Sequence, residues 1–205
     1  MQFGFPPASY AILILIVAVS ALGLTSAPSI IERNLLRPYR VAKHSEYSTL
    51  ITCGFVHGDF WHLLFNAVTL YFFGPNLELT IGTPRFLALY FIALLVSSLG
   101  TVIKQRNNPD YASLGASGAI NGVLFAYIVY YPTASILLYF AVPIPAALFA
   151  VGYLVYSMWA AKHSRDRINH DAHLDGAITG LVFVALTDFG VWREAFQTVF
   201  ASFGG

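Results

Sequence analysis

The 205-residue chain is 57% hydrophobic and only 10% charged, and its mean hydropathy is +0.66. Soluble domains carry about 25% charged residues, so this composition predicts a protein whose surface faces lipid. The formal net charge of +1 gives no basis for a nucleic-acid partner, and a single cysteine, Cys53, excludes an internal disulfide framework. No linker or internal repeat divides the sequence, so residues 1–205 are expected to form one membrane domain.

Six stretches are apolar enough to be predicted as transmembrane helices. About 20 apolar residues cross a bilayer core of roughly 30 Å. Such stretches lie at about residues 9–27, 60–79, 84–104, 115–131, 146–161 and 171–189. The first is expected to be a retained span, because it lacks the basic region and the cleavage site of a signal peptide. The predicted fold class is therefore all-α, a polytopic bundle of six transmembrane helices.

Three further segments are expected to lie at the membrane surface. Residues 28–59 form a long first loop that mixes cationic and apolar residues, which is typical of an interfacial segment. Prolines interrupt helices, so Pro132 and Pro143–Pro145 are expected to separate spans four and five by an apolar surface hairpin at 132–145. The tail from residue 191 is expected to form a short interfacial helix.

The cationic residues are distributed unevenly between the two sides. Six spans place the first, third and fifth loops together, and these loops contain Arg33, Arg37, Arg40, Lys43, Lys104, Arg106, Lys162, Arg165 and Arg167. The other side has Arg85 and Arg193. Because cytoplasmic loops carry an excess of Lys and Arg, this distribution alone predicts that the odd-numbered loops are cytoplasmic.

Polar side chains stand at the starts of three predicted spans. His62 and Asn66 are four residues apart and share one helix face, as do Ser117 and Asn121. His173 stands at the start of the sixth span. Such residues are costly within a bilayer and mark functional sites. All three span starts face the odd-loop side, so these side chains are expected at one level of the membrane.

Two GxxxG pairs indicate how the spans could pack. They are Gly118 with Gly122 on the fourth span and Gly176 with Gly180 on the sixth. Glycine pairs of this kind let helix backbones approach closely. Contact between the two pairs would bring Ser117 near His173, and a serine needs an adjacent base to act as a nucleophile.

Each of these signals also has a structural interpretation. A serine between glycines more often serves helix packing, and His62 with Asn66 could be an interhelical hydrogen-bond pair. His57, His163 and His170 lie in or near loops and are expected to be solvated.

Neither a carboxylate nor a metal is expected to assist His173. Asp171 and Asp175 each lie two residues from it, which on a helix points them away, so a dyad is favoured over a triad. His170 is three residues from His173, but no HExxH motif or acidic partner accompanies them, so no metal is expected. A solute pathway remains an alternative, although the repeated halves typical of transporters are absent.

In combination, three motifs resemble the rhomboid family of intramembrane serine proteases in its compact six-span form common in bacteria. They are His57-x4-His62-x3-Asn66, Gly115-Ala116-Ser117-Gly118 and Ala172-His173-x2-Gly176-x3-Gly180. The resemblance implies that Ser117 is the nucleophile and His173 the general base. It further implies an oxyanion hole at His62 and Asn66, a tight turn at Gly115 and a structural role for His57.

The resemblance also implies partners and a location. The substrates would be membrane proteins cut in or near a transmembrane segment within the lipid bilayer, with no cofactor, no metal and no nucleic acid. The expected location is a bacterial-type inner (plasma) membrane, with the active site open away from the cytoplasm, opposite to the charge distribution. A rhomboid-like protein that binds membrane clients without cutting them is the alternative.

The sequence departs from the family at three places. Glu46-Tyr47-Ser48-Thr49 replaces a stretch that often contains Trp-Arg. Asp175 stands where a small or apolar residue is expected. Asn121 replaces an aromatic residue that stacks on the catalytic histidine, so a hydrogen bond from Asn121 is expected to hold His173 instead.

Overall fold

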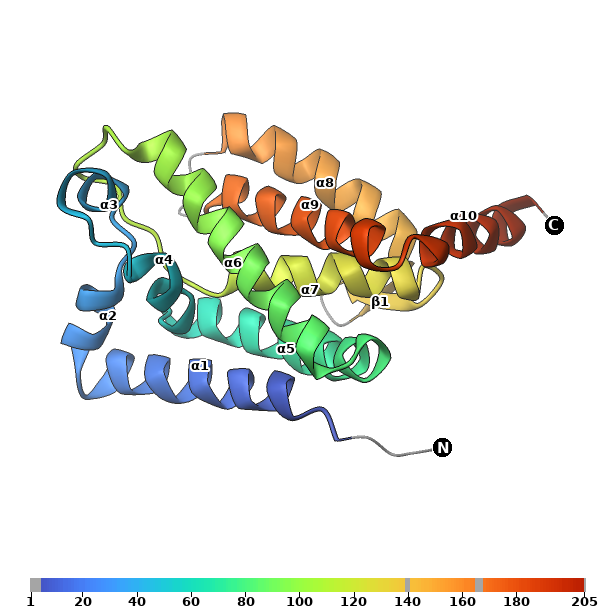
Figure 1. The fold of residues 1–205 in the computed structure, drawn as a ribbon, viewed down its shortest axis with the longest axis horizontal. Coiled ribbons are helices and arrows are strands. Elements are labelled where there is room, and N and C mark those ends of the chain that lie inside the picture. The colour runs from blue at the N-terminus through green and yellow to red at the C-terminus, as the bar shows by residue number, and fades with distance from the viewer. Residues whose placement is uncertain (1–4, 139–140, 165–167, 205) are drawn as a thin grey trace.

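Six long helices form the body of the protein in the computed structural model, which describes residues 5–138, 141–164 and 168–204 (Figure 1). They are α1 (Pro7–Thr25), α5 (Phe60–Ile81), α6 (Thr83–Gln105), α7 (Ser117–Tyr130), α8 (Ala146–His163) and α9 (His170–Thr187). Each occupies one of the predicted ranges to within a few residues. Arg165 and Arg167, which were part of the charge comparison, lie outside the described residues.

Length and apolarity identify fewer spans than six in the described part of the chain. Only α1 and α6 are both long and apolar enough by themselves, while α9 and the following α10 (Phe189–Gly204) qualify as one pair bent by 112°. Helix α7 is apolar but has only 14 residues, about 20 Å of helix. The six-span count therefore stays a prediction.

The segment between α1 and α5 folds into short pieces. They are α2 (Pro28–Asn34), α3 (Pro38–His44), α4 (Thr49–Thr52) and the 3-10 helix η1 (Cys53–Phe55). Proline opens α2 and α3, where its missing N–H costs no hydrogen bond. Leu36, Val41, Leu50 and Cys53 form a small core with Val102 of α6. This first connection is thus packed onto the bundle.

A β-hairpin separates α7 from α8. Strand β1 (Ser135–Leu138) pairs antiparallel with β2 (Val142–Pro145), and Ser135 lies opposite Pro145. The prolines of β2 are tolerated because a two-stranded sheet consists only of edge strands. Pro145 then precedes the first residue of α8, so the hairpin ends where the next helix begins.

Helix α7 is the central helix of the bundle. Eleven of its 14 residues are buried, and it packs against α5, α6 and α9. Its first turn begins further into the bundle than the end of the neighbouring α6 (Figure 1). Since a bilayer core is roughly 30 Å thick, a helix of this length has room to start below the membrane surface.

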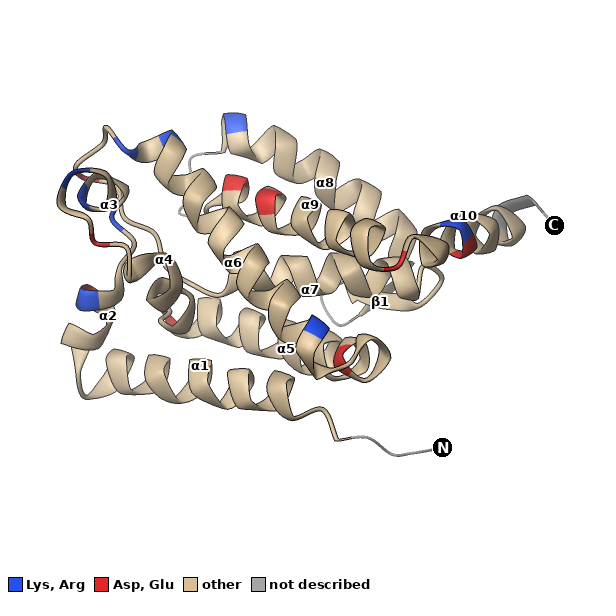
Figure 2. Ribbon diagram, in the orientation of Figure 1, with Lys and Arg blue, Asp and Glu red and all other residues tan. Residues whose placement is uncertain are grey.

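Charged residues avoid the middle of the helices. None occurs between the ends of α1, α6, α7 and α8. Lysines and arginines gather instead around α2, α3 and the C-terminal ends of α6 and α8 (Figure 2). Large apolar side chains are exposed on the outer helices, for example Ile14 on α1 and Val151 on α8. This distribution is that of helices whose middle portions lie in hydrocarbon.

Candidate active site

Ser117 and His173 are in hydrogen-bond contact. Ser117 is the first residue of α7 and His173 lies in the first turn of α9. Their Oγ and Nε2 atoms are 2.8 Å apart, within the range required for proton transfer between a nucleophile and its base. Both side chains are partly buried. The contact joins residues 56 positions apart in the sequence.

Glycines allow α9 to approach the first turns of α7. A Cβ on Gly176 would lie 2.0 Å from the carbonyl oxygen of Gly118, and one on Gly180 would lie 2.2 Å from that of Gly122. Gly118 also makes room for α6, because a Cβ there would lie 2.1 Å from Ser97 Oγ. The two GxxxG pairs therefore lie against each other, and larger residues would push the helix of His173 away from Ser117.

The segment before α7 (residues 111–116) is held by the first connection. The backbones of Leu36 and Ser113 exchange two N–H···O bonds of 2.9 Å, and the Gly115 N–H donates to the carbonyl of Cys53 at 2.9 Å. Non-helical backbone at membrane depth is tolerated only where such partners exist or water reaches it. The first connection thereby fixes the chain that delivers Ser117.

Gly115 and His62 are matched in shape. Gly115 has φ +109°, a conformation that favours glycine, and a Cβ there would lie 2.5 Å from Cε1 of His62. The His62 ring thus rests on the backbone two residues before Ser117. Any side chain at position 115 would displace this ring as well as strain the turn.

His57 is a buried structural link. Its Nε2 accepts the N–H of Ala116 at 3.4 Å, so Nδ1 carries the ring proton and donates to Ser20 Oγ of α1 at 2.8 Å. Burial lowers the pKa of His57 to about 3, with a smaller contribution from His62, so its ring is neutral. Its ring also lies edge-on to that of His62, with centroids 4.9 Å apart.

The expectation that His57 and His170 are solvated is wrong. His57 has no exposed surface and His170 is 5% exposed. His170 is buried because the first turn of α9 packs beside α8, where its ring meets that of Tyr156 edge-on at 5.7 Å. Proximity to a loop in the sequence did not imply exposure, since these loops fold back onto the bundle.

Asn66 and His62 line the same cavity as the Ser117–His173 pair. This cavity has a volume of about 840 Å³. Asn66 is 6% exposed, and its Nδ2 donates one hydrogen bond, of 2.9 Å, to the carbonyl of His62. An amide nitrogen has a second N–H, so Asn66 keeps a donor for a further acceptor. The first N–H groups of α7, starting at Ser117, also lack intrahelical acceptors.

Tyr153 of α8 contacts His173 where Asn121 was expected. The Tyr153 hydroxyl lies 3.3 Å from His173 Nδ1. The Asn121 Nδ2 instead donates to the carbonyl of Ser117 at 2.9 Å. The reason is geometric: Asn121 is four residues after Ser117 on the same helix, so its short side chain reaches back along α7. Sequence reasoning missed Tyr153, which no motif distinguishes from the other tyrosines.

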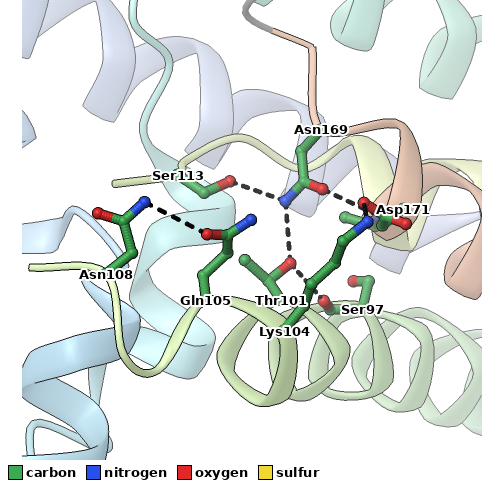
Figure 3. Close-up of polar contacts among 9 residues, drawn as sticks. Ser97, Thr101, Lys104, Gln105, Asn108, Ser113, Asn169 and Asp171 are labelled. Atoms are coloured by element: carbon green, nitrogen blue, oxygen red, sulfur yellow. Dashed lines mark hydrogen bonds and ion pairs between the residues drawn. The ribbon is translucent and has the colours of Figure 1, made fainter. Parts of the chain in front are cut away.

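Asn169 is a second residue that the sequence did not reveal. Its Oδ1 accepts the N–H of Ala172 at 3.1 Å and so caps α9. Its Nδ2 donates to Thr101 Oγ1 of α6 at 2.9 Å and to Ser113 Oγ at 3.2 Å (Figure 3). One side chain thus connects the helix of His173, the neighbouring α6 and the segment before Ser117. An asparagine before an apolar helix is the signal that could have identified the cap.

The two carboxylates near His173 are directed at α6. Asp171 Oδ2 pairs with Lys104 Nζ at 2.5 Å (Figure 3). Asp175 packs on Gly100, where a Cβ would lie 2.0 Å from its Oδ2. Within the described residues, no group of three or more His, Cys, Asp and Glu side chains is placed to hold a metal ion.

The fold and the site together define a helical integral membrane protein with a serine–histidine pair. The Rhomboid domain matches residues 44–188, which contain the whole site, and the chain therefore belongs to the rhomboid family.

Known members of the family are similar along much of the chain. The mitochondrial RHOMBOID-like protein 12 of Arabidopsis thaliana is 29% identical over 74% of this chain and 49% of its own length. The mitochondrial Rhomboid protein 1 of Saccharomyces cerevisiae is 33% identical over 66% and 40%, respectively. The rhomboid protein YdcA of Bacillus subtilis is 38% identical over 42% of both chains. The matches thus span less than half of each of these relatives.

Proposed function

We propose that this protein is a serine endopeptidase that hydrolyses peptide bonds in or near the transmembrane segments of membrane-protein substrates. The observation that carries the proposal is the 2.8 Å contact between Ser117 Oγ and His173 Nε2 at the wall of a large cavity. A serine hydroxyl becomes nucleophilic when a neighbouring base accepts its proton. Membership of the rhomboid family supports this activity.

In the first half of the reaction, Ser117 Oγ attacks the carbonyl carbon of the scissile peptide bond while its proton passes to His173 Nε2. The carbonyl oxygen becomes a tetrahedral oxyanion. His173 then gives the proton to the leaving amine as the C–N bond breaks, which leaves an acyl ester on Ser117. In the second half, a water attacks this ester, with His173 again accepting the proton and returning it to Ser117.

The oxyanion requires donors fixed before the reaction starts. We assign this role to the second N–H of Asn66, an N–H of the His62 ring and the backbone N–H of Ser117. Asn66 is held by its bond to the His62 carbonyl, and His62 by the fit of its ring on Gly115. Because these groups are already packed in place, their alignment costs little when charge develops.

We further propose that residues 1–205 form a single rhomboid domain with six spans in a bacterial-type inner (plasma) membrane. The six helices in the predicted ranges and their uncharged middle portions support this arrangement. A short α7 then places Ser117 below the membrane surface, and the cavity supplies the water that hydrolysis consumes. No cofactor or metal takes part in these steps.

A fluorophosphonate probe, which reacts with activated serines, tests the nucleophile. The detergent-solubilised wild-type protein should be labelled, Ser117→Ala should not be, and His173→Ala should be labelled at least tenfold more slowly, as expected for loss of a general base. Ser26→Ala, which changes an exposed serine after α1, is the matched control and should label normally.

Two outcomes would contradict the proposal. Equal labelling of wild type and Ser117→Ala would exclude Ser117 as the nucleophile, and no labelling of folded wild type would favour a client-binding protein. For the oxyanion hole, Asn66→Ala should lower kcat on a defined transmembrane substrate by about 10²-fold, the loss typical of one oxyanion donor. Unchanged turnover would remove Asn66 from this role.

A further inference from the structure

The two ring nitrogens of His173 have different neighbours. Nε2 lies 2.8 Å from Ser117 Oγ, and Nδ1 lies 3.3 Å from the hydroxyl oxygen of Tyr153. To accept the serine proton, Nε2 must be unprotonated, so the ring proton of neutral His173 is on Nδ1. The Nδ1–H group then donates to the Tyr153 hydroxyl, which is its neighbour from a third helix.

Tyr153 is well fixed on α8. Its ring packs against Phe125 of α7 and Phe149 of α8, with centroids 5.5 and 5.7 Å away. The side chains of Asn121 and Ser157 lie close to its hydroxyl. A tyrosine hydroxyl both accepts and donates, so it can accept the Nδ1–H of His173 and still donate to a further acceptor.

Tyr153 holds the place that a carboxylate has in a catalytic triad. Among the described residues, the charged and titratable groups near His173 include Asp171, Asp175 and Lys104 on the α6 side, His170 with its ring centroid 6.1 Å away, and His62 across the cavity. Asp171 is paired with Lys104, and Asp175 packs on Gly100. In a catalytic triad a carboxylate fixes the tautomer and orientation of the histidine.

We propose that Tyr153 is a positioning residue for His173: its hydroxyl holds the imidazole with Nδ1 protonated and Nε2 directed at Ser117. This inference rests on the proposed function, because it matters only if His173 is the base. It also makes the geometry of the base depend on the docking of α8 against α9.

The test compares Tyr153→Phe with wild type, since this change removes the hydroxyl and keeps the ring packing. We expect kcat on a defined transmembrane substrate to fall about tenfold with KM unchanged, the rate equivalent of one ordinary hydrogen bond. A bond from Nδ1–H stabilises the imidazolium form. Its loss should therefore move the acid limb of the kcat profile to lower pH, which a packing defect would not do.

Controls separate this role from folding and from the proposed function. Rates are normalised to the final extent of Ser117 labelling, so unfolded protein does not count. Tyr156→Phe changes a half-exposed tyrosine three residues along α8 and should behave as wild type.

Different results would contradict the positioning role of Tyr153 and the proposed protease function. A wild-type kcat and pH profile in Tyr153→Phe would overturn the positioning role, while Ser117-dependent labelling of wild type would still support the protease. If the wild-type protein shows no Ser117-dependent labelling, that result would instead contradict the proposed function, on which the positioning role depends.

Discussion

Single side chains at this site act mainly through neutral hydrogen bonds. His57 links α1 to the segment before Ser117, and Asn169 links that segment to α6 and α9. Neither His57 nor Asn169 belongs to the proposed catalytic pair. Both residues nevertheless hold the backbone from which the side chains of that pair project. Polar groups that are completely paired make a buried site rigid, whereas a missing partner leaves the full desolvation cost of the other group.

Asn169 permits a prediction that separates capping from positioning. Asn169→Ala should destabilise the protein by about 1 kcal/mol through loss of the helix cap. Asn169→Asp keeps the acceptor for the Ala172 N–H but cannot donate to Thr101 or Ser113. We expect it to keep most of the thermal stability and still slow probe labelling of Ser117 severalfold. Wild-type labelling in Asn169→Asp would show that these two donor bonds do not position the site.

At the scale of helices, the pair is assembled by the packing of α7 on α9. The closest approach is between Gly176 of α9 and the Gly118 carbonyl, one residue after Ser117. Because that neighbour is backbone, it cannot yield as a flexible side chain would. Helix α8 is held less firmly: its buried residues are Ala146, Ser157 and Ala160, and many of its apolar side chains are exposed.

Replacing a glycine by alanine should disrupt the site on α9 but not on α8. Gly176→Ala should cost at least 1–3 kcal/mol, as overpacking does, and should abolish Ser117 labelling by separating the two helices. Gly152→Ala on α8 is the matched control, since a Cβ there meets nothing within 4 Å. It should be neutral or stabilising by up to about 1 kcal/mol, because alanine is the better helix former. Unfolding and labelling measured on both variants check this, and an active Gly176→Ala would refute the packing account.

The whole molecule has two unlike ends, and its orientation is the main question at this scale. Helices α5, α7 and α9 begin toward the end that carries α2, α3 and most of the described Lys and Arg residues (Figures 1 and 2). Their first turns contain His62, Ser117 and His173, respectively. The positive-inside rule would put that end in the cytoplasm. The rule is weaker here, because many of these charges belong to a long connection that packs on α6. Because the rhomboid resemblance implies an active site open away from the cytoplasm, we expect this end to face away from the cytoplasm.

Cysteine labelling in intact cells tests this orientation. An impermeant maleimide should modify Arg106→Cys, at the site end, and not Arg85→Cys, at the opposite end. Cys53 needs no replacement: it is buried, and burial raises the pKa of its thiol to about 11, so it forms little reactive thiolate. Labelling of Arg85→Cys alone would establish the reverse orientation.

Features that depend on local pattern could be predicted from the amino-acid sequence alone. Apolar runs and prolines predicted where the long helices and the hairpin lie, and the motifs identified Ser117, His173, His62 and Asn66 as candidates. Gly115 was likewise predicted at a tight turn, and its φ of +109° is a backbone property that local sequence encodes. The motifs named the candidate residues but did not show which of them touch.

The contacts between side chains became known only from the folded structure. It placed Tyr153 rather than Asn121 at His173 Nδ1, and it buried His57 and His170. These contacts join residues 14 to 59 positions apart in the chain, so no periodicity or spacing contains them. They follow from how α8 and α9 dock on the central α7, and docking is settled by glycine contacts and shape across several helices at once.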